Sequence, residues 1–216
     1  MAKNLNNLQQ YSAGEEIFNS VTHGIGALLS VAGLAVLVVF AALHGDRWHV
    51  ISFSIFGGSL ICLYGASTLY HGFSRPSIKT FFKKLDHSAI FLLIAGTYTP
   101  FMLVTLRGAW GWSLFGIIWT MAVAGICIKS VSGFKFRKLS ALVYLFMGWL
   151  GVVAIKEIIS AAPPPTVALL VVGGLSYTAG VLFYLYRKLP FNHGIWHMFV
   201  LCGSVSHYFA VLFILR

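Results

Sequence analysis

The stretch Gly24–Leu43, GIGALLSVAGLAVLVVFAAL, contains no charged side chain. An α-helix of about 20 apolar residues is long enough to cross the hydrocarbon core of a bilayer. The glycine and alanine residues of this stretch suit close packing against neighbouring helices. The stretch therefore predicts a membrane protein whose first spanning segment covers about residues 22–43.

The composition extends this prediction to the whole chain. The 216 residues are 58% hydrophobic and 9% charged, whereas a soluble domain carries about 25% charged residues. The strand alternation of outer-membrane barrels is absent. We therefore expect an all-α, polytopic seven-transmembrane-helix bundle, with a polar interfacial segment at 1–21 and a membrane domain at 22–216. The seven spans are expected at about residues 22–43, 48–71, 87–106, 110–129, 139–160, 166–188 and 194–215.

Lysine and arginine residues indicate the orientation of these spans. Eleven lie on the side of the N-terminus, and four lie on the other side. The positive-inside rule then predicts a cytoplasmic N-terminus and an outside C-terminus. The net charge of +10 is mainly a topology signal, and anionic lipid headgroups account for it without a nucleic-acid partner. The eleven are Lys3, Arg75, Lys79, Lys83, Lys84, Lys129, Lys135, Arg137, Lys138, Arg187 and Lys188, and the four are Arg47, Arg107, Lys156 and Arg216.

Two other features exclude further classes of protein. The polar N-terminal residues lack the form of a cleavable signal peptide, so we expect the first span to be retained. Cys62, Cys127 and Cys202 lie inside apolar stretches without a CxxC pair. We expect them to pack as small hydrophobic residues, with no disulfide framework and no cysteine metal site.

Polar residues from three distant spans return to one membrane level. His71 lies where the second span ends, and Asp86 lies where the third begins. His193 and His197, in the motif HGIWH, occupy the first turns of the seventh span. The topology places all four at the cytoplasmic end, and an ionisable cluster that faces a bundle interior is typical of a functional site.

The spacing of the histidines favours a metal site. Residues at i and i+4 of a helix lie about 5–6 Å apart at Cβ, so His193 and His197 suit two ligands of one ion. A third imidazole, from His71, leaves a fourth position for water, as in catalytic zinc sites. The alternatives are an interfacial histidine that only forms hydrogen bonds, a pair of unrelated histidines, and an Asp86 that serves as a helix N-cap.

Further polar residues could complete this site. Ser67 lies four residues before His71 and could orient its imidazole or donate to an oxyanion, or it could bond a carbonyl of its own helix. Glu16, Asn19 and His23 share one face of an interfacial helix. That face could close over the site or face the cytosol, and we favour closure.

The other histidines are expected outside the site. His44 and His49 lie in the first outside loop, and His87 is rotated by about 100° from Asp86 around the helix. His207 lies about 21 Å along the helix axis from His193, which is too far to share an ion. We expect His207 to make a buried polar contact.

Four blocks of sequence resemble one known family. They are EEIFNSVTHGIG (Glu15–Gly26), STLYH (Ser67–His71), KKLDHSAIFLLIAGTYTPF (Lys83–Phe101) and PFNHGIWHMFVLCGSVSHYFAVLF (Pro190–Phe213). Together they resemble the bacterial hemolysin III proteins, the prokaryotic branch of the progestin and adiponectin receptor superfamily. The likeness covers nearly the whole chain.

This resemblance implies a site as well as a fold. It implies seven membrane helices and a zinc ion near the cytoplasmic face, held by His71, His193 and His197. It also implies that Asp86 holds the zinc-bound water and that Ser67 stands one turn before the ligand of the second helix. The superfamily is similar to the alkaline ceramidases, which implies zinc-dependent hydrolysis of lipid amides.

Three functional classes remain open. The first is a hydrolase of lipid amide or ester bonds in the bacterial plasma (inner) membrane, in which zinc activates water, Asp86 takes its proton and Ser67 stabilises the oxyanion. The second is a non-enzymatic sensor or regulator of membrane homeostasis with a structural zinc. The third is the cytolysin that the family name implies. Membrane lipids are the expected partners in each class, and no oligomeric state follows from the sequence.

The orientation can be tested with reporter fusions. A reporter fused at Lys3 should face the cytosol, and one fused after Arg216 should face the other side, because seven spans separate the two ends. Finding both reporters on one side would show that a span is miscounted. The residues of the proposed site would then no longer lie at one membrane level.

Overall fold

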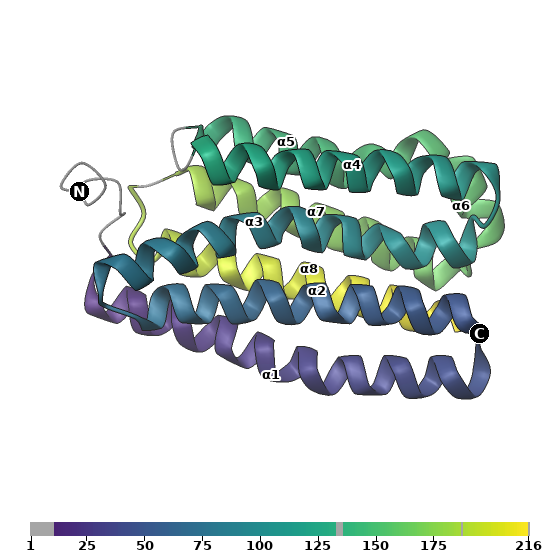
Figure 1. Cartoon of the computed structure of the whole chain (residues 1–216), viewed down its shortest axis with the longest axis horizontal. Helices are drawn as coiled ribbons and strands as arrows, with labels where there is room; N and C mark the ends of the chain where they lie inside the picture. Colours follow the sequence, from purple (N-terminus) through teal and green to yellow (C-terminus); the bar gives the residue numbers. More distant parts are fainter. Residues whose placement is uncertain (1–10, 133–135, 187, 216) are drawn as a thin grey trace.

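The computed structural model describes residues 11–132, 136–186 and 188–215 of the chain. Throughout these residues the regular structure is helical, and seven helical stretches are long and apolar enough to cross a membrane. The fold class is therefore confirmed, because the chain forms an all-α bundle of seven long apolar helical stretches (Figure 1). The elements are α1 (Ala13–His44), α2 (Arg47–Gly72), α3 (Pro76–Pro100), the π-helical η2 (Phe101–Thr105), α4 (Ala109–Ser132), α5 (Arg137–Trp149), the 3₁₀-helical η3 (Leu150–Ala154), α6 (Ile155–Ala161), α7 (Pro164–Leu185), α8 (Asn192–Leu212) and the 3₁₀-helical η4 (Phe213–Leu215).

The helices pack as a ring, and α4 is the one span outside this ring among the described residues. α1 packs against α2, α2 against α3, and α3 against both α4 and α5. The ring closes because α5 packs against α7, α7 against α8, and α8 against α1. In Figure 1 the first described residues and the end of α8 lie at opposite ends of the bundle, as an odd number of spans requires. Which end faces the cytoplasm stays a prediction. Four of the charged residues on which that prediction rests lie outside the described residues, namely Lys3, Lys135, Arg187 and Arg216.

The outer surface of the ring suits a lipid solvent. Large apolar side chains such as Leu28 and Val131 are exposed, with exposed fractions of 75% and 90%. The interior instead buries aromatic and aliphatic side chains of α2 and α3, among them Phe53, Phe56 and Leu93. In water such an exterior would be costly, but next to lipid tails it is favourable.

The first helix begins earlier than its apolar stretch. α1 starts at Ala13 rather than near residue 22, because Ser12 caps it. The Ser12 hydroxyl accepts a hydrogen bond from the Glu15 N–H at 3.2 Å, and the Ser12 N–H donates to the Glu15 carboxylate at 2.9 Å. This capping box begins a continuous helix that includes residues 13–21, which were predicted as part of a polar interfacial segment with a helix leading into the first span. Residues 1–10 of that segment lie outside the described part of the chain.

The third helix also begins earlier than predicted. α3 starts at Pro76, which follows the N-cap Arg75, and proline is well suited to the first position of a helix. Asp86 consequently lies well inside α3, and the alternative in which it caps the helix is wrong. Hydropathy marks where a helix enters the apolar layer, whereas α3 continues beyond that layer through polar sequence.

Helix α4 approaches α3 closely at Gly125. A Cβ atom added at Gly125 would overlap the ring of Phe91, which is buried between α3, α4 and α5. Gly116 lies on the same helix, and a Cβ atom there would meet open space. The two glycines are therefore a matched pair for testing this contact.

We expect Gly125→Ala to lower the stability of the purified protein by roughly 1–3 kcal/mol, the usual cost of overpacking a core. Gly116→Ala should leave stability unchanged or slightly raised, because alanine favours helix and nothing obstructs its methyl group. Thermal unfolding in one detergent would measure both variants. Equal melting temperatures for the two would contradict this packing of α3 against α4.

Candidate metal centre

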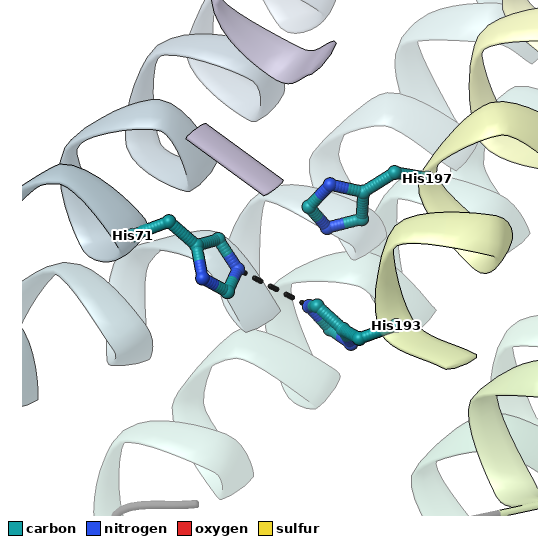
Figure 2. A group of neighbouring side chains, drawn as sticks. All are labelled: His71, His193 and His197. Carbon is teal, nitrogen blue, oxygen red and sulfur yellow. Dashed lines mark hydrogen bonds between the residues drawn. The ribbon is translucent and has the colours of Figure 1, made fainter. Parts of the chain in front are cut away.

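Three imidazoles meet where α2 ends and α8 begins. His71 lies in the last turn of α2, and His193 and His197 lie in the first two turns of α8. Figure 2 shows their rings converging, and the Nε2 atoms of His71 and His193 lie 3.2 Å apart. One nitrogen from each of the three rings lies within 4.8 Å of the other two. The i, i+4 spacing on α8 thus brings two imidazoles to the same point as His71.

The start of α8 is held by its neighbours. Phe191, just before the helix, adopts a left-handed backbone conformation with φ of 56°, which is uncommon for a residue other than glycine. Its N–H donates to the Glu15 carboxylate of α1 at 3.0 Å, and the Asn192 amide donates to the Phe183 carbonyl of α7 at 3.0 Å. These contacts set where the first turns of α8 begin, and hence where His193 and His197 lie.

Glu16 of α1 orients the imidazole of His71. Its carboxylate accepts a hydrogen bond from His71 Nδ1 at 2.7 Å, so the Nε2 atom keeps a free lone pair toward the other two rings. The same carboxylate forms an ion pair with Lys79 of α3 at 2.8 Å. A histidine whose second nitrogen donates to a carboxylate is the usual arrangement behind a metal ligand.

Two further side chains of α1 lie against His197. The His23 ring stacks on the His197 ring, with centroids 3.5 Å apart and planes 9° apart. The Thr22 hydroxyl lies 3.4 Å from His197 Nδ1, which leaves the buried Nε2 atom without a partner. Asn19, only 1% exposed, lies beside α8 at Gly194. The predicted face of Glu16, Asn19 and His23 therefore closes over the histidines rather than facing away.

Buried polar atoms without hydrogen-bond partners concentrate at this end of the bundle. Among the described residues nine such side-chain atoms occur, and six of them belong to Asn19, His23, Ser67 and His197. Buried polar groups in native proteins are nearly always paired, and an exception commonly marks a bound ion, water or ligand. The unpaired atoms therefore indicate that this cluster binds something.

Asp86 and Ser67 lie at the same end. Ser67 is fully buried one turn before His71, and its hydroxyl approaches the Asp86 carboxylate without reaching hydrogen-bond geometry with any partner. Ser67 therefore does not bond a carbonyl of its own helix, which was the alternative. Asp86 is 3% exposed, and its carboxylate lies 3.6 Å from His87 Nδ1.

Sequence reasoning missed three residues of this cluster. Tyr11 precedes α1 and lies against His71 and His193, with ring centroids 5.6 and 5.1 Å apart. Burial raises the pKa of the Tyr11 phenol well above its ordinary value, so the phenol beside the two histidines stays neutral. Thr22 and Lys79 are the others. Thr22 lies three residues after Asn19, and Lys79 lies seven residues before Asp86, so helical spacing could have pointed to both. Only contacts between helices show which side chains they meet.

The remaining histidines lie outside the centre, as expected, but His44 and His49 do not lie in a loop. His44 is the last residue of α1, and His49 lies in the first turn of α2. His49 pairs with Asp46, the N-cap of α2, at the opposite end of the bundle. His87 Nδ1 lies 2.8 Å from the Lys83 carbonyl. His207 Nε2 lies 3.2 Å from the Leu170 carbonyl, which is a partly buried polar contact between α8 and α7. In His49, His87 and His207 a ring nitrogen thus contacts a group outside the three-histidine cluster.

The donor set suits a metal ion. Tetrahedral zinc at about 2.0–2.1 Å from each nitrogen separates two ligand nitrogens by roughly 3.3 Å, close to the 3.2 Å between His71 and His193. The unpaired His197 Nε2 supplies a third lone pair. The three-histidine cluster could therefore hold a metal ion.

An apolar cavity begins beside this cluster. It has a volume of about 130 Å³ and lies, partly open to its surroundings, between α3, α5, α7 and α8. His23 and Asp86 line one end, and Tyr98, Trp149 and His207 line it further along the bundle. The polar cluster thus stands at the head of an elongated apolar space.

Known proteins resemble this chain in sequence over nearly all of these spans. The chain matches the family described as Haemolysin-III related over residues 11–208. The chain belongs to the haemolysin III family. Hemolysin-3 of Bacillus cereus is 50% identical over 199 residues, which are 92% of this chain and 91% of its own. The Hemolysin-3 homolog of Bacillus subtilis (strain 168) is 46% identical over 203 residues, or 94% and 95% of the two chains.

More distant members of the superfamily are similar as well. The heptahelical transmembrane protein ADIPOR2 of Oryza sativa subsp. japonica is 29% identical over 192 residues, which cover 78% of this chain and 82% of its own. The resemblance to the progestin and adiponectin receptor superfamily is confirmed. With the seven apolar helices, family membership makes this chain a multi-pass membrane protein.

The contact between Glu16 and His71 predicts a graded loss of metal affinity. We expect Glu16→Ala to weaken zinc binding by about 10–100-fold, because the His71 ring loses the group that orients it. Glu16→Gln should cost less, since the amide oxygen still accepts from Nδ1. Competition with a zinc chelator would measure these affinities. Glu157→Ala, on α6 at the far end of the bundle, is the control, and equal affinities for Glu16→Ala and the control would contradict the assignment.

Proposed function

We propose that this protein is a zinc-dependent hydrolase of lipid amide or ester bonds, with its metal centre at the cytoplasmic face of the plasma (inner) membrane. One observation carries the proposal. The three-histidine cluster lies beside an apolar cavity, whose lining includes Asp86 and His23, the ring that stacks on His197. A lipid whose chain enters the cavity would bring the bond beside its headgroup to the histidines.

Zinc is the ion we assign to the cluster. Three neutral imidazoles with an open fourth position are typical of catalytic zinc, and nitrogen ligands suit zinc better than magnesium or calcium. His71, His193 and His197 would hold it. When bound, zinc would supply a Lewis acid and lower the pKa of a water molecule in the fourth position.

The residues around the cluster would provide the proton transfers. The Asp86 carboxylate accepts a proton from the attacking water as the water oxygen bonds to the substrate carbonyl carbon. The same proton then passes to the leaving nitrogen or oxygen, so that lipid and water yield a carboxylic acid and an amine or alcohol. The Ser67 hydroxyl, buried without a partner, donates to the carbonyl oxygen as negative charge develops there.

Membrane lipids are the partners in this proposal. The cavity walls are mainly apolar and aromatic side chains, such as Leu93, Tyr144 and Trp196, which suit an acyl chain and exclude bulk water from the reacting bond. Nucleic acid has no role here, because the basic residues are accounted for by anionic headgroups.

A second candidate function is a structural zinc in a non-enzymatic regulator of membrane homeostasis. The observation that favours it is the position of the cluster, which joins α2 to α8 with support from α1 through Glu16 and Thr22. An ion there would tie together helices that are far apart in sequence. The third candidate is cytolysis, which rests on the name of the Bacillus cereus relative.

The variant Asp86→Asn distinguishes a catalytic zinc from a structural zinc. Asparagine cannot accept the proton, so hydrolysis should fall by roughly 10²–10⁴-fold, the usual contribution of a general base. Zinc should remain bound, because the three imidazoles are untouched. Turnover of ceramides, other N-acyl amides and phospholipid esters in mixed micelles would be measured beside zinc content. Asp46→Asn, which changes a carboxylate at the far end of the bundle, should keep both.

Two outcomes would count against the hydrolase. If Asp86→Asn loses zinc as completely as His71→Ala, then Asp86 is a direct ligand, the site is closed, and hydrolysis should be abandoned. If the wild-type protein is zinc-loaded but turns over none of these lipids, the structural zinc is favoured. A structural zinc predicts that Asp86→Asn stays folded and functional in the membrane phenotype that is scored.

A further inference from the structure

A second cavity lies beyond the first, toward the end of the bundle away from the metal centre. It has a volume of about 110 Å³ and is again partly open, and Ile158 and Val167 line its far end. The two cavities have six lining residues in common, so they are neighbours along one apolar passage. These residues are Thr97, Tyr98, Gly148, Trp149, Gly174 and His207.

Two breaks in regular helix geometry shape the second cavity. α3 passes at Pro100 into the π-helical turn η2, and α5 passes into the 3₁₀ turn η3 after Trp149. Residues of both turns, including Phe101 and Gly151, line the cavity. The Tyr98 hydroxyl satisfies the broken backbone, because it accepts from the Gly151 N–H at 2.7 Å and donates to the Gly148 carbonyl at 2.9 Å. Such breaks inside helices frequently mark functional sites.

His207 faces both cavities with only one of its nitrogens paired. Its Nε2 atom lies 3.2 Å from the Leu170 carbonyl, and a carbonyl can only accept, so Nε2 carries the proton. A charged imidazole is costly within the hydrocarbon layer, so Nδ1 is left as an acceptor. The Nε2–Cδ2 edge of the ring lies against Gly173 of α7. Nδ1 is buried and has no partner.

The other polar side chains that line the second cavity are paired. The Thr97 hydroxyl donates to the Leu93 carbonyl at 2.8 Å. The Trp149 N–H donates to the Thr178 hydroxyl at 3.0 Å, and Tyr98 forms the two bonds described above. Among the described residues that line this cavity, His207 therefore has the one side-chain polar atom that lacks a partner. That atom requires a hydrogen-bond donor.

We propose that the second cavity binds a lipid chain that carries a hydroxyl group, whose O–H donates to His207 Nδ1. The walls around His207 are apolar, so the rest of the ligand at this level is hydrocarbon. A buried water normally needs two to four polar partners, and among the described residues that line this cavity His207 Nδ1 is the one side-chain polar atom without a partner. A hydroxyl attached to a chain needs only that one, because the cavity holds the chain itself. The inference goes beyond the proposed hydrolysis and does not depend on it.

The test compares fatty acids that differ only in a hydroxyl group. Full-length protein in detergent is loaded with a fluorescent polyene fatty acid, which is then displaced by stearate or by hydroxystearates with the hydroxyl at successive positions. We expect one position to bind about three- to ten-fold more tightly than stearate, the usual net effect of one buried hydrogen bond. His207→Leu should lose that preference and keep its affinity for stearate.

A second variant keeps the test decisive if His207→Leu does not fold. In His207→Asn the side-chain oxygen replaces the Nδ1 acceptor, so the preference should persist. Ser206→Ala is the control, because that hydroxyl bonds the Cys202 carbonyl of its own helix and its loss should leave the preference unchanged. No preference at any position in the wild type, which is also the result expected if only water occupies the cavity, would overturn the proposal. A preference that persists in folded His207→Leu, or is lost in folded His207→Asn, would also overturn it.

These ligands contain no amide or ester bond, so the outcome is independent of catalysis. A protein that hydrolyses nothing could still show the preference, and an active hydrolase could lack it. Failure of this inference and failure of the proposed function are therefore separate results.

Discussion

The meeting of His71 with His193, whose Nε2 atoms lie 3.2 Å apart, is the contact on which the other features of the site depend. It joins the end of α2 to the start of α8, two helices separated by most of the chain. Burying polar groups in a bundle surrounded by lipid is costly unless they are paired. Much of this end of the molecule provides such partners. Glu16 pairs with His71, Thr22 lies beside His197, and Glu15 accepts from the backbone that leads into α8.

The sequence could predict the three-histidine cluster because its members obey helix geometry. His193 and His197 share a face of α8, and counting spans returns His71 to the same level. The start of α3 was misplaced, because hydropathy detects apolar sequence, whereas α3 begins in the polar sequence before it. For α1 the predicted interfacial helix and the first span form one continuous helix. The Ser12–Glu15 capping box was a local signal for the true start of α1.

Other parts of the site depend on tertiary contacts that no spacing contains. Tyr11 covers His71 and His193 from a residue before α1, and Lys79 reaches Glu16 from another helix. His207 makes a polar contact, as predicted, although the contact is only partly buried, and its unpaired Nδ1 atom could not be foreseen. Its residue lines a cavity that the turns η2 and η3 help to form, and this cavity is known only from the structure.

X-ray absorption at the zinc edge would test the central claim most directly. Protein purified without added metal should contain about one zinc per chain, with three imidazole nitrogens at about 2.0–2.1 Å and one oxygen. His193→Ala and His71→Ala should each lose the metal. Sulfur scattering at about 2.3 Å would instead assign the ion to cysteine. That result, or full zinc occupancy in the variant lacking both His193 and His197, would contradict a centre built from these three histidines.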